Sequence, residues 1–395
     1  MCNMSLPTIK SSYLAFLVAS ISVFAANAQE LSLGVVQDSL SISNGELISA
    51  YLPSDYSDDH SWPLVFFFDP GGRASLPINK YAALSEEYGF IAVCTYNSRN
   101  GPMDPGLRSF DMVSDYFKSA YSIDEKGIIT SGFSGGSRMA LATAASTSDI
   151  KGVIACGAGQ PGPEHLRSAK GDQYSYVGLV GNLDFNFLEM LELEEQLSQQ
   201  GIRNMRIVFE GDHHWPSPED FELAYLWIRF DTDGSKNESL LKQLLMEKIE
   251  SRVKNGDFLY AKSLLQNSEK MGLDMNEIAT VFADMNESMD DLDKEWDKVV
   301  KAESKIIKSL SEKIFAMDRA LALATVMEAD EFKYWSSTIK NFKRKSEKNI
   351  GLKGQSYHRI KSFIGANMAE RSFMYKQHLR NDLADQLREL WELSR

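Results

Sequence analysis

Three features are scarce in this sequence: cysteine, positive charge and long hydrophobic runs. The formal net charge of −13 argues against nucleic acid or an anionic membrane as the main partner. Beyond the first 28 residues no segment is long and apolar enough to cross a bilayer, so we expect no membrane span in the mature chain. Cys94 and Cys156 lie in apolar runs and are expected to be buried thiols; a disulfide between them does not follow from the sequence.

The N-terminus has the layout of a secretory signal peptide. Lys10 precedes the apolar run "YLAFLVASISVFAA", and the small residues "ANA" at positions 26–28 suit a cleavage site. We expect residues 1–28 to be removed, which gives a secreted or periplasmic protein that starts at Gln29. An uncleaved membrane anchor is the alternative, but the apolar run is short for a span, and no cysteine follows it to accept a lipid.

Residues 29–233 are predicted to form one α/β domain. Short, near-continuous apolar runs alternate with helical stretches, which is typical of parallel strands buried on both faces. We therefore expect a mainly parallel sheet of the doubly wound kind, with helices on both faces. The predicted strands include "PLVFFFDP", "FIAVCTY", "GIITSGFS", "GVIACGA", "YVGLVGN" and "MRIVFEG".

Residues 234–395 follow a different pattern and are predicted to form a separate all-α domain of long helices. This part is rich in Lys, Glu, Leu and Met and contains no convincing strand. In "ESLLKQLLMEKIESRV", the apolar residues lie along one stripe with a helical period: Leu240, Leu241, Leu244, Leu245 and Ile249. The helices are expected to cover the substrate, to mediate self-association or to contact another protein, although such a charge pattern is more typical of a solvated helix face.

The segment "GFSGG" places Ser134 between the predicted strand "KGIIT" and the predicted helix "SRMALATAA". A G-x-S-x-G match alone is modest evidence, because a glycine-rich structural turn has the same residues. A strand-to-helix turn is sharp, and Gly132 and Gly136 leave room for it. Such a turn exposes the Ser134 hydroxyl at the carboxyl end of the sheet and presents the Gly135 amide to developing negative charge. Ser134 is therefore a candidate nucleophile.

A nucleophilic serine requires a base and an acid that orients the base. His213 and His214 follow the last predicted strand, at the sheet edge where the base is expected, and their adjacency leaves the choice open. Asp184 follows the strand "YVGLVGN" and is the predicted acid. Glu164, in an earlier loop, and Glu189, inside a predicted helix, are the alternatives.

These residues and their order resemble the α/β-hydrolase superfamily, most closely its secreted esterases, the polyhydroxybutyrate depolymerases and feruloyl esterases. In that group the catalytic histidine stands in a G-x-H-x-W-P setting, which here reads "GDHHWP", so the resemblance selects His213 as the base. The family's G-x-x-D pattern with a nearby Asn matches Gly181, Asp184 and Asn186. The resemblance covers the first half of the chain and implies an α/β-hydrolase fold with esterase activity there.

The loop after "PLVFFF" departs from the group that the chain resembles. Members of that group often carry a His-Gly pair there, whereas this chain has "DPGGR". The amide of Gly71 or Gly72 is expected to be the second donor of an oxyanion hole, and a tight turn without that role is an equal alternative. A carboxylate at Asp69 would oppose an oxyanion unless Arg73 or Arg99 pairs with it.

Arg99 and Trp215 are the candidates for the substrate pocket. Arg99 lies in "TYNSRNGP", which follows a predicted strand and therefore sits at the same edge of the sheet. It would grip a substrate carboxylate there, although a surface ion pair is the more ordinary use of an arginine.

The sequence thus predicts an exported serine hydrolase that cleaves a small or polymeric carboxylic ester through an acyl-enzyme, using Ser134, His213 and Asp184. This chemistry needs no cofactor and no metal, and further ligands for a metal beside the paired histidines are not apparent. One alternative is a serine peptidase of the prolyl-oligopeptidase kind, although the chain lacks room for the usual β-propeller. The other is a non-catalytic binding or scaffolding protein that uses its helical half.

Overall fold

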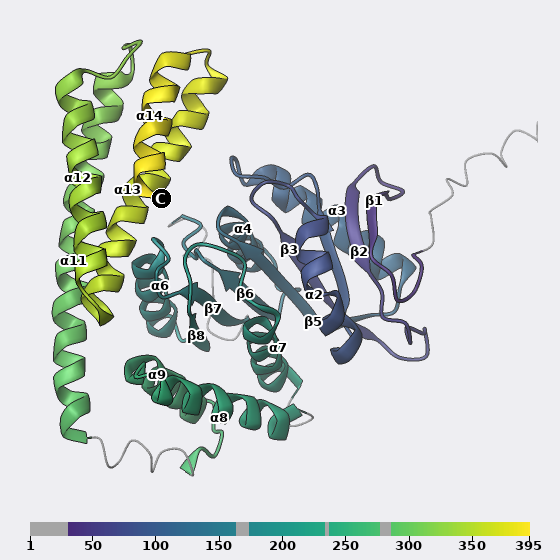
Figure 1. Ribbon diagram of the computed structural model, residues 1–395. Coiled ribbons are helices and arrows are strands. Elements are labelled where there is room, and N and C mark those ends of the chain that lie inside the picture. Colours follow the sequence, from purple (N-terminus) through teal and green to yellow (C-terminus); the bar gives the residue numbers. More distant parts are fainter. Residues whose placement is uncertain (1–30, 163–173, 234–236, 277–285) are drawn as a thin grey trace, which may run out of the picture.

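The computed structural model describes residues 31–162, 174–233, 237–276 and 286–395 (Figure 1). The expected signal peptide lies outside the described residues. Within them, one eight-stranded sheet has the strand order β1-β2-β4-β3-β5-β6-β7-β8. The pairings β1–β2 and β2–β4 are antiparallel, and all the others are parallel. The strands are β1 (Gln37–Ser41), β2 (Leu47–Tyr51), β3 (Trp62–Phe68), β4 (Ile91–Thr95), β5 (Ile123–Phe133), β6 (Gly152–Cys156), β7 (Ser175–Gly181) and β8 (Asn204–Phe209).

Helices cover both faces of this sheet. They are α2 (Ser75–Tyr88), α3 (Asp104–Ala120), α4 (Gly135–Ser146), α6 (Phe187–Gln199) and α7 (Pro218–Asp233). Successive strand residues point to opposite faces, so β3 sends Phe67 into one core and Phe66 and Phe68 into the other. Helices α2 and α7 pack in the first core, and α3, α4 and α6 pack in the second. This is a mainly parallel sheet of the α/β-hydrolase type, so the predicted fold class is confirmed for this half.

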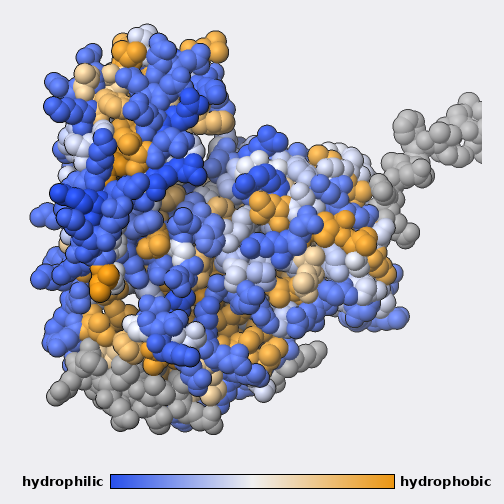
Figure 2. Space-filling model, in the orientation of Figure 1, coloured by the Kyte–Doolittle hydropathy of each residue, from blue (hydrophilic) through white to orange (hydrophobic). Residues whose placement is uncertain are grey.

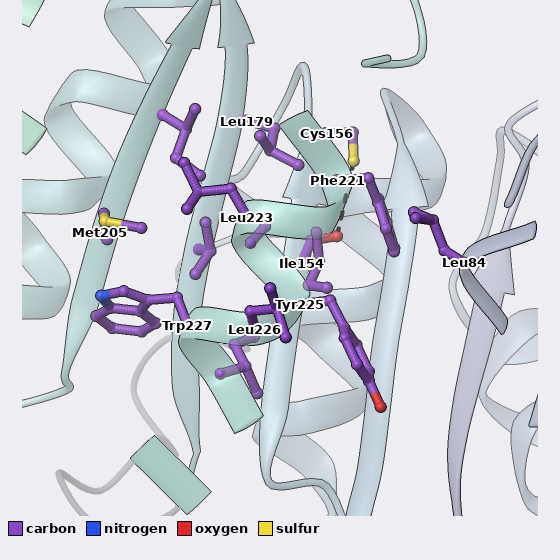
Figure 3. Close-up of a cluster of buried hydrophobic side chains, with 14 of the residues drawn as sticks. Leu84, Ile154, Cys156, Leu179, Met205, Phe221, Leu223, Tyr225, Leu226 and Trp227 are labelled. Atoms are coloured by element: carbon purple, nitrogen blue, oxygen red, sulfur yellow. Dashed lines mark hydrogen bonds between the residues drawn. The ribbon is translucent and has the colours of Figure 1, made fainter. Parts of the chain in front are cut away.

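Helix α7 supplies much of the first core. Figure 3 shows Phe221 and Trp227 of α7 among strand residues such as Leu179 and Met205. Phe221 and Trp227 are fully buried. Because α7 begins shortly after the segment that carries His213, its packing anchors one end of that segment to the sheet.

Two further helices, α8 (Glu238–Lys254) and α9 (Phe258–Lys270), pack onto the same core as α7. Leu245 of α8 and Leu264 of α9 belong to one buried cluster with residues of the central strands. The apolar stripe predicted for α8 is therefore buried against the α/β half. The border between the hydrophobic cores lies beyond α9 and not after Asp233, where the composition changes.

The C-terminal part forms a helical bundle with a core of its own (Figure 1). Trp335, Ile339, Ile364 and Leu387 are fully buried in that core, so the predicted all-α character of this part is confirmed. Figure 2 shows a mostly hydrophilic surface over these helices, with hydrophobic patches between them. No helix of the described residues has the length and hydrophobicity of a membrane span. The bundle helices are α11 (Asn286–Leu321), α12 (Ala329–Lys348), α13 (Gly351–Gln377) and α14 (Asn381–Ser394).

Cys94 and Cys156 lie in strands β4 and β6, where both are free and fully buried. Burial raises the pKa of each thiol far above its ordinary value, because the interior disfavours the thiolate. The two side chains are therefore inert core residues, as their apolar surroundings predicted.

Leu245→Ala should destabilise the α/β half by about 2–5 kcal/mol, because the truncation leaves a cavity in a core that α8 shares with the sheet. Equilibrium urea unfolding, followed by tryptophan fluorescence, measures the change. Leu323→Ala is the matched control: this leucine is 98% exposed, and its truncation should change stability by less than about 0.5 kcal/mol. Equal stabilities of the two variants would contradict the placement of α8 in this core.

Candidate active site

Ser134 occupies a sharp turn between β5 and α4. Its backbone has φ 53° and ψ −120°, a conformation that residues with a Cβ rarely adopt. The Ser134 amide donates a hydrogen bond of 2.8 Å to the carbonyl oxygen of Cys156 at the end of β6. The carbonyl oxygen of Ser134 accepts from the amides of Ser137 and Arg138, in the first turn of α4. The turn is thus fixed by the strand beside it and by the helix after it.

The glycines on either side of Ser134 allow a very close backbone approach. A Cβ on Gly132 would stand 2.2 Å from the carbonyl oxygen of Gly136. A Cβ on Gly136 would stand 2.0 Å from the carbonyl oxygen of Phe68, at the end of β3. Real Cβ atoms never come this near to backbone, so both positions require glycine. The predicted role of these two glycines, to make room for the turn, agrees with this geometry.

His213 lies beside the hydroxyl of Ser134. Its Nε2 is 2.9 Å from Ser134 Oγ, and its side chain is 19% exposed. The imidazole sits between the rings of Phe133 and Phe185, with centroids 4.5 Å and 4.3 Å away. The histidine lies in the segment after β8, and the aromatic rings restrict the orientation of its ring while the side chain stays partly exposed.

Asp184 holds the other nitrogen of the imidazole. Both of its carboxylate oxygens contact His213 Nδ1, at 3.0 Å and 2.9 Å, and the residue is fully buried. One oxygen also accepts a 2.8 Å hydrogen bond from the amide of Asn186. Because an ionised carboxylate can only accept, Nδ1 carries the hydrogen and Nε2 presents its lone pair to Ser134. The structure therefore joins Ser134, His213 and Asp184 in one hydrogen-bonded chain.

The alternative residues for the base and the acid have other partners. His214 Nδ1 contacts the carbonyl oxygen of Trp215 at 2.8 Å. Glu189 pairs with Arg138 at 2.6 Å and accepts hydrogen bonds from the amides that follow β6. Glu164 lies outside the described residues. Neither His214 nor Glu189 is therefore placed to act on Ser134.

The turn at residues 69–72 uses its amides internally. The amide of Gly71 donates to Asp69 Oδ1 at 2.9 Å, and that of Gly72 donates to the carbonyl oxygen of Asp69 at 3.0 Å. This is the tight turn that the sequence left as an alternative for this loop. For Gly71 or Gly72 to bind an oxyanion, the amide concerned would first have to leave Asp69.

Asp69 is fully buried, and both of its carboxylate oxygens accept hydrogen bonds. Arg73 binds both carboxylate oxygens, at 2.9 Å and 3.0 Å, although the arginine side chain itself is 56% exposed. Burial raises the pKa of Asp69, but hydrogen bonds outweigh it, first of all that from Arg73, so the pKa stays below its ordinary value. The predicted pairing by Arg73 thus accounts for the carboxylate beside the site.

The two predicted pocket residues differ in exposure. Trp215 is only 7% exposed; its indole Nε1 donates to Asp69 at 3.2 Å, and its ring packs 5.6 Å from that of Phe133. Arg99 is exposed, and its Nε lies 2.6 Å from where a Cβ on Gly72 would stand. Within the described residues Arg99 forms no ion pair, so the more ordinary surface pairing is not seen there. Trp215 supports the site from the core, and Arg99 lies over the turn beside it.

Two further residues at the site escaped the sequence prediction. Gly157 has φ 68°, and a Cβ there would approach Asp184 Oδ2 to 3.0 Å and His213 Cε1 to 3.3 Å. Asn100 contributes the three heavy atoms nearest to a Cβ on Gly135, with Oδ1 only 1.7 Å away. The sequence did offer a signal for each residue. Gly157 directly follows a predicted strand, and Asn100 lies in a loop at the carboxyl end of another predicted strand.

Other binding features lie apart from these residues. Among the described residues, no group of three or more His, Cys, Asp or Glu side chains is arranged to hold a metal ion. Two depressions have volumes of about 320 Å³ and 390 Å³, and Ser134, His213 and Asp184 line neither of them.

Comparison with known proteins gives likeness at the level of fold. No protein-family model matches the chain, and no curated protein matches it. An esterase from Pyrobaculum calidifontis is 14% identical with a TM-score of 0.39, over 61% of this chain and 93% of that one. A feruloyl esterase module from Clostridium thermocellum is 15% identical with a TM-score of 0.42, over 51% of this chain and 89% of that one. A ferulic acid esterase is 15% identical with a TM-score of 0.39, over 51% and 97%.

Asp69→Asn should make the stability of the fold less sensitive to acid. A carboxylate with a lowered folded pKa stabilises the fold above the unfolded pKa of about 3.9, and this contribution is lost as the pH falls through the folded value. The wild type should be the more stable protein at pH 7 and should lose more stability than the variant between about pH 5 and pH 2. Urea unfolding over this pH series measures both curves, and parallel curves would contradict the assignment.

Proposed function

We propose that the protein is a serine hydrolase that cleaves carboxylic esters through an acyl-enzyme. The observation that carries this proposal is the hydrogen-bonded chain from Ser134 Oγ through His213 to the buried Asp184. Loops at the carboxyl ends of β5, β7 and β8 supply the three residues, in the chain order serine, aspartate, histidine. The strained backbone at Ser134 supports the same reading, because such strain gathers at functional sites.

In the proposed reaction, Ser134 Oγ attacks the carbonyl carbon of the ester while its proton passes to His213 Nε2. Asp184 stabilises the imidazolium that forms and keeps the ring in position. The tetrahedral intermediate collapses, the bond to the alcohol oxygen breaks, and His213 returns the proton to the leaving alcohol. Water then attacks the acyl-enzyme by the same sequence of steps and releases the acid. None of these steps requires a cofactor.

The oxyanion requires at least two donors. The Gly135 amide is one, because it directly follows the nucleophile in the first turn of α4, where unpaired amides favour negative charge. For the second we assign the carboxamide of Asn100, which lies against Gly135 with Oδ1 as its nearest atom and has to turn its Nδ2 toward the oxyanion to donate; Gly71 and Gly72 already donate to Asp69. The amide of Asn100 itself donates 2.8 Å to the carbonyl oxygen of Pro70, which holds its loop in place.

The rest of the proposal concerns export and substrate. The N-terminal signal pattern supports a secreted or periplasmic protein, and a small or polymeric carboxylic ester is the proposed substrate. A peptide substrate is the second candidate, since the same residues can cleave amides. Solved structures with a similar fold include a peptidase, an acylaminoacyl peptidase from Pyrococcus horikoshii.

Ser134→Ala should abolish covalent labelling by a fluorophosphonate probe and lower kcat for an ester by about 10⁴–10⁶-fold, because the nucleophile is lost. In-gel fluorescence and ester hydrolysis measure the two effects on the mature protein. Ser137→Ala, which alters a buried hydroxyl bonded to the carbonyl oxygen of Ala158, is the control and should still be labelled. A folded wild-type protein that the probe does not label would refute the proposal.

A panel of matched p-nitrophenyl esters and peptide anilides on the same preparation then separates esterase from peptidase. Higher kcat/KM for the esters over anilides of the same acyl group supports the proposal only if the difference exceeds that of spontaneous hydrolysis. If the anilides are preferred once spontaneous hydrolysis is taken into account, the protein is a peptidase and the esterase proposal is wrong.

Asn100→Ala should lower kcat for an ester by about 10²–10³-fold at nearly unchanged KM, since an oxyanion donor acts mainly in the transition state. Steady-state kinetics on a soluble ester measures this. Asn97→Ala is the matched control, because this exposed residue of the same loop bonds Glu46 and should leave kcat within about threefold. Unchanged kcat in Asn100→Ala would return the role to an amide of the Asp69 turn.

A further inference from the structure

A buried arginine of the C-terminal bundle contacts the loop that carries Asp184. Arg359 lies in α13, and its side chain is 2% exposed. Its Nη1 donates a 2.7 Å hydrogen bond to the carbonyl oxygen of Asn182, two positions before Asp184. Its guanidinium also stands 4.4 Å from the ring centroid of Phe187, which begins α6 after the same loop. The arginine thus touches the loop on both sides of the carboxylate.

A second helix, α11, binds the side of the guanidinium that does not contact the loop. Glu303 of α11 is fully buried and binds Arg359 with both oxygens, at 2.8 Å from Nε and 2.5 Å from Nη2. This fork geometry sets the plane of the guanidinium and leaves Nη1 directed at the loop. In Figure 1 the first half of α13 runs beside α6, where this contact is made.

The same loop is tied to the segment that carries His213. The Oδ1 of Asn182 accepts a 3.1 Å hydrogen bond from the Gly211 amide, and the amide of Leu183 donates 2.9 Å to the Gly211 carbonyl oxygen. Gly211 is two positions before His213. A shift of Asn182 would therefore reach both the loop that carries Asp184 and the segment that carries His213.

The buried ion pair is hard to explain by stability alone. Removing two charges from water costs free energy that their attraction repays only in part, so apolar replacements of buried pairs are often neutral or stabilising. What an apolar pair cannot supply is a donor for the buried carbonyl oxygen of Asn182. What Arg359 specifically contributes is thus the hydrogen bond that fixes the position of the Asn182 carbonyl in the loop.

We propose that Arg359 is a positioning residue, through which helices α11 and α13 hold the Asp184 loop in the arrangement that the hydrolase reaction requires. This inference rests on the proposed function of Ser134, His213 and Asp184. The C-terminal bundle accordingly serves the active site directly, by fixing the acid and, through Gly211, the base.

The test compares two ion pairs that join the same two helices. Glu303→Gln with Arg359→Met removes the pair at the loop without leaving a lone buried charge. Asp318→Asn with Arg371→Met is the matched control, since that pair also joins α11 to α13, at 2.6 Å and 2.7 Å, and touches no residue of the loop. Arg359→Lys alone keeps a donor and a charge, and it is the milder variant if the first pair of substitutions prevents folding.

Two readouts are measured on full-length mature protein. The first is ester hydrolysis: the loop variant should lose about 10–100-fold in kcat at KM within about twofold, because misplacement by about 1 Å costs this much. Arg359→Lys should recover part of the loss, and the control pair should match wild type. The second is hydrogen exchange of the peptide spanning residues 179–187, measured in a Ser134→Ala background, where the loop variant should exchange at least about tenfold faster.

Lower kcat together with faster exchange in the loop variant, against an unchanged control, supports the proposal. Unchanged kcat or unchanged exchange in a folded loop variant overturns it, and so does an equal loss in the control pair, which would indicate a general effect of bundle stability. If wild type neither hydrolyses esters nor reacts with the fluorophosphonate, the proposed function fails. The exchange readout then still decides whether Arg359 holds the loop.

Discussion

The strained turn at Ser134 is the constraint that the packing of the central strands has to satisfy. A residue with a Cβ at positive φ costs of order 1–3 kcal/mol, so the surrounding structure must hold it there. Here β3, β5 and β6 do so, because the carbonyl oxygen of Phe68 packs against Gly136 and that of Cys156 accepts from the Ser134 amide. A well-packed parallel sheet is thus a requirement for the geometry of one hydroxyl.

The parts of the site that the sequence predicted are those that follow from the direction of the strands. Parallel strands bring the loops at their carboxyl ends to one edge, so Ser134, Asp184 and His213 could be assigned to a common place without any distances. The donors to an oxyanion could not be assigned in this way. Whether the amides of Gly71 and Gly72 face a substrate depends on Asp69, whose carboxylate accepts from the Gly71 amide and whose carbonyl oxygen accepts from the Gly72 amide.

A similar limit applies to the helices. The stripe that includes Leu245 predicted a helix with one buried face, but a stripe does not specify its partner. Composition changes after Asp233, whereas the hydrophobic core of the sheet continues through α8 and α9. Arg359 shows the limit most clearly. A charged residue in a Lys-rich helix is ordinarily solvated, and only the placement of Glu303 and of the Asn182 carbonyl explains its burial.

The contact between Asn182 and Arg359 joins positions that are 177 residues apart. The eight strands of the described sheet all lie before position 210, so Arg359 follows the whole sheet in the sequence. The loop that carries Asp184 therefore takes its buried donor from a part of the chain that lies beyond the whole sheet, so a chain cut short after the sheet would lack that donor.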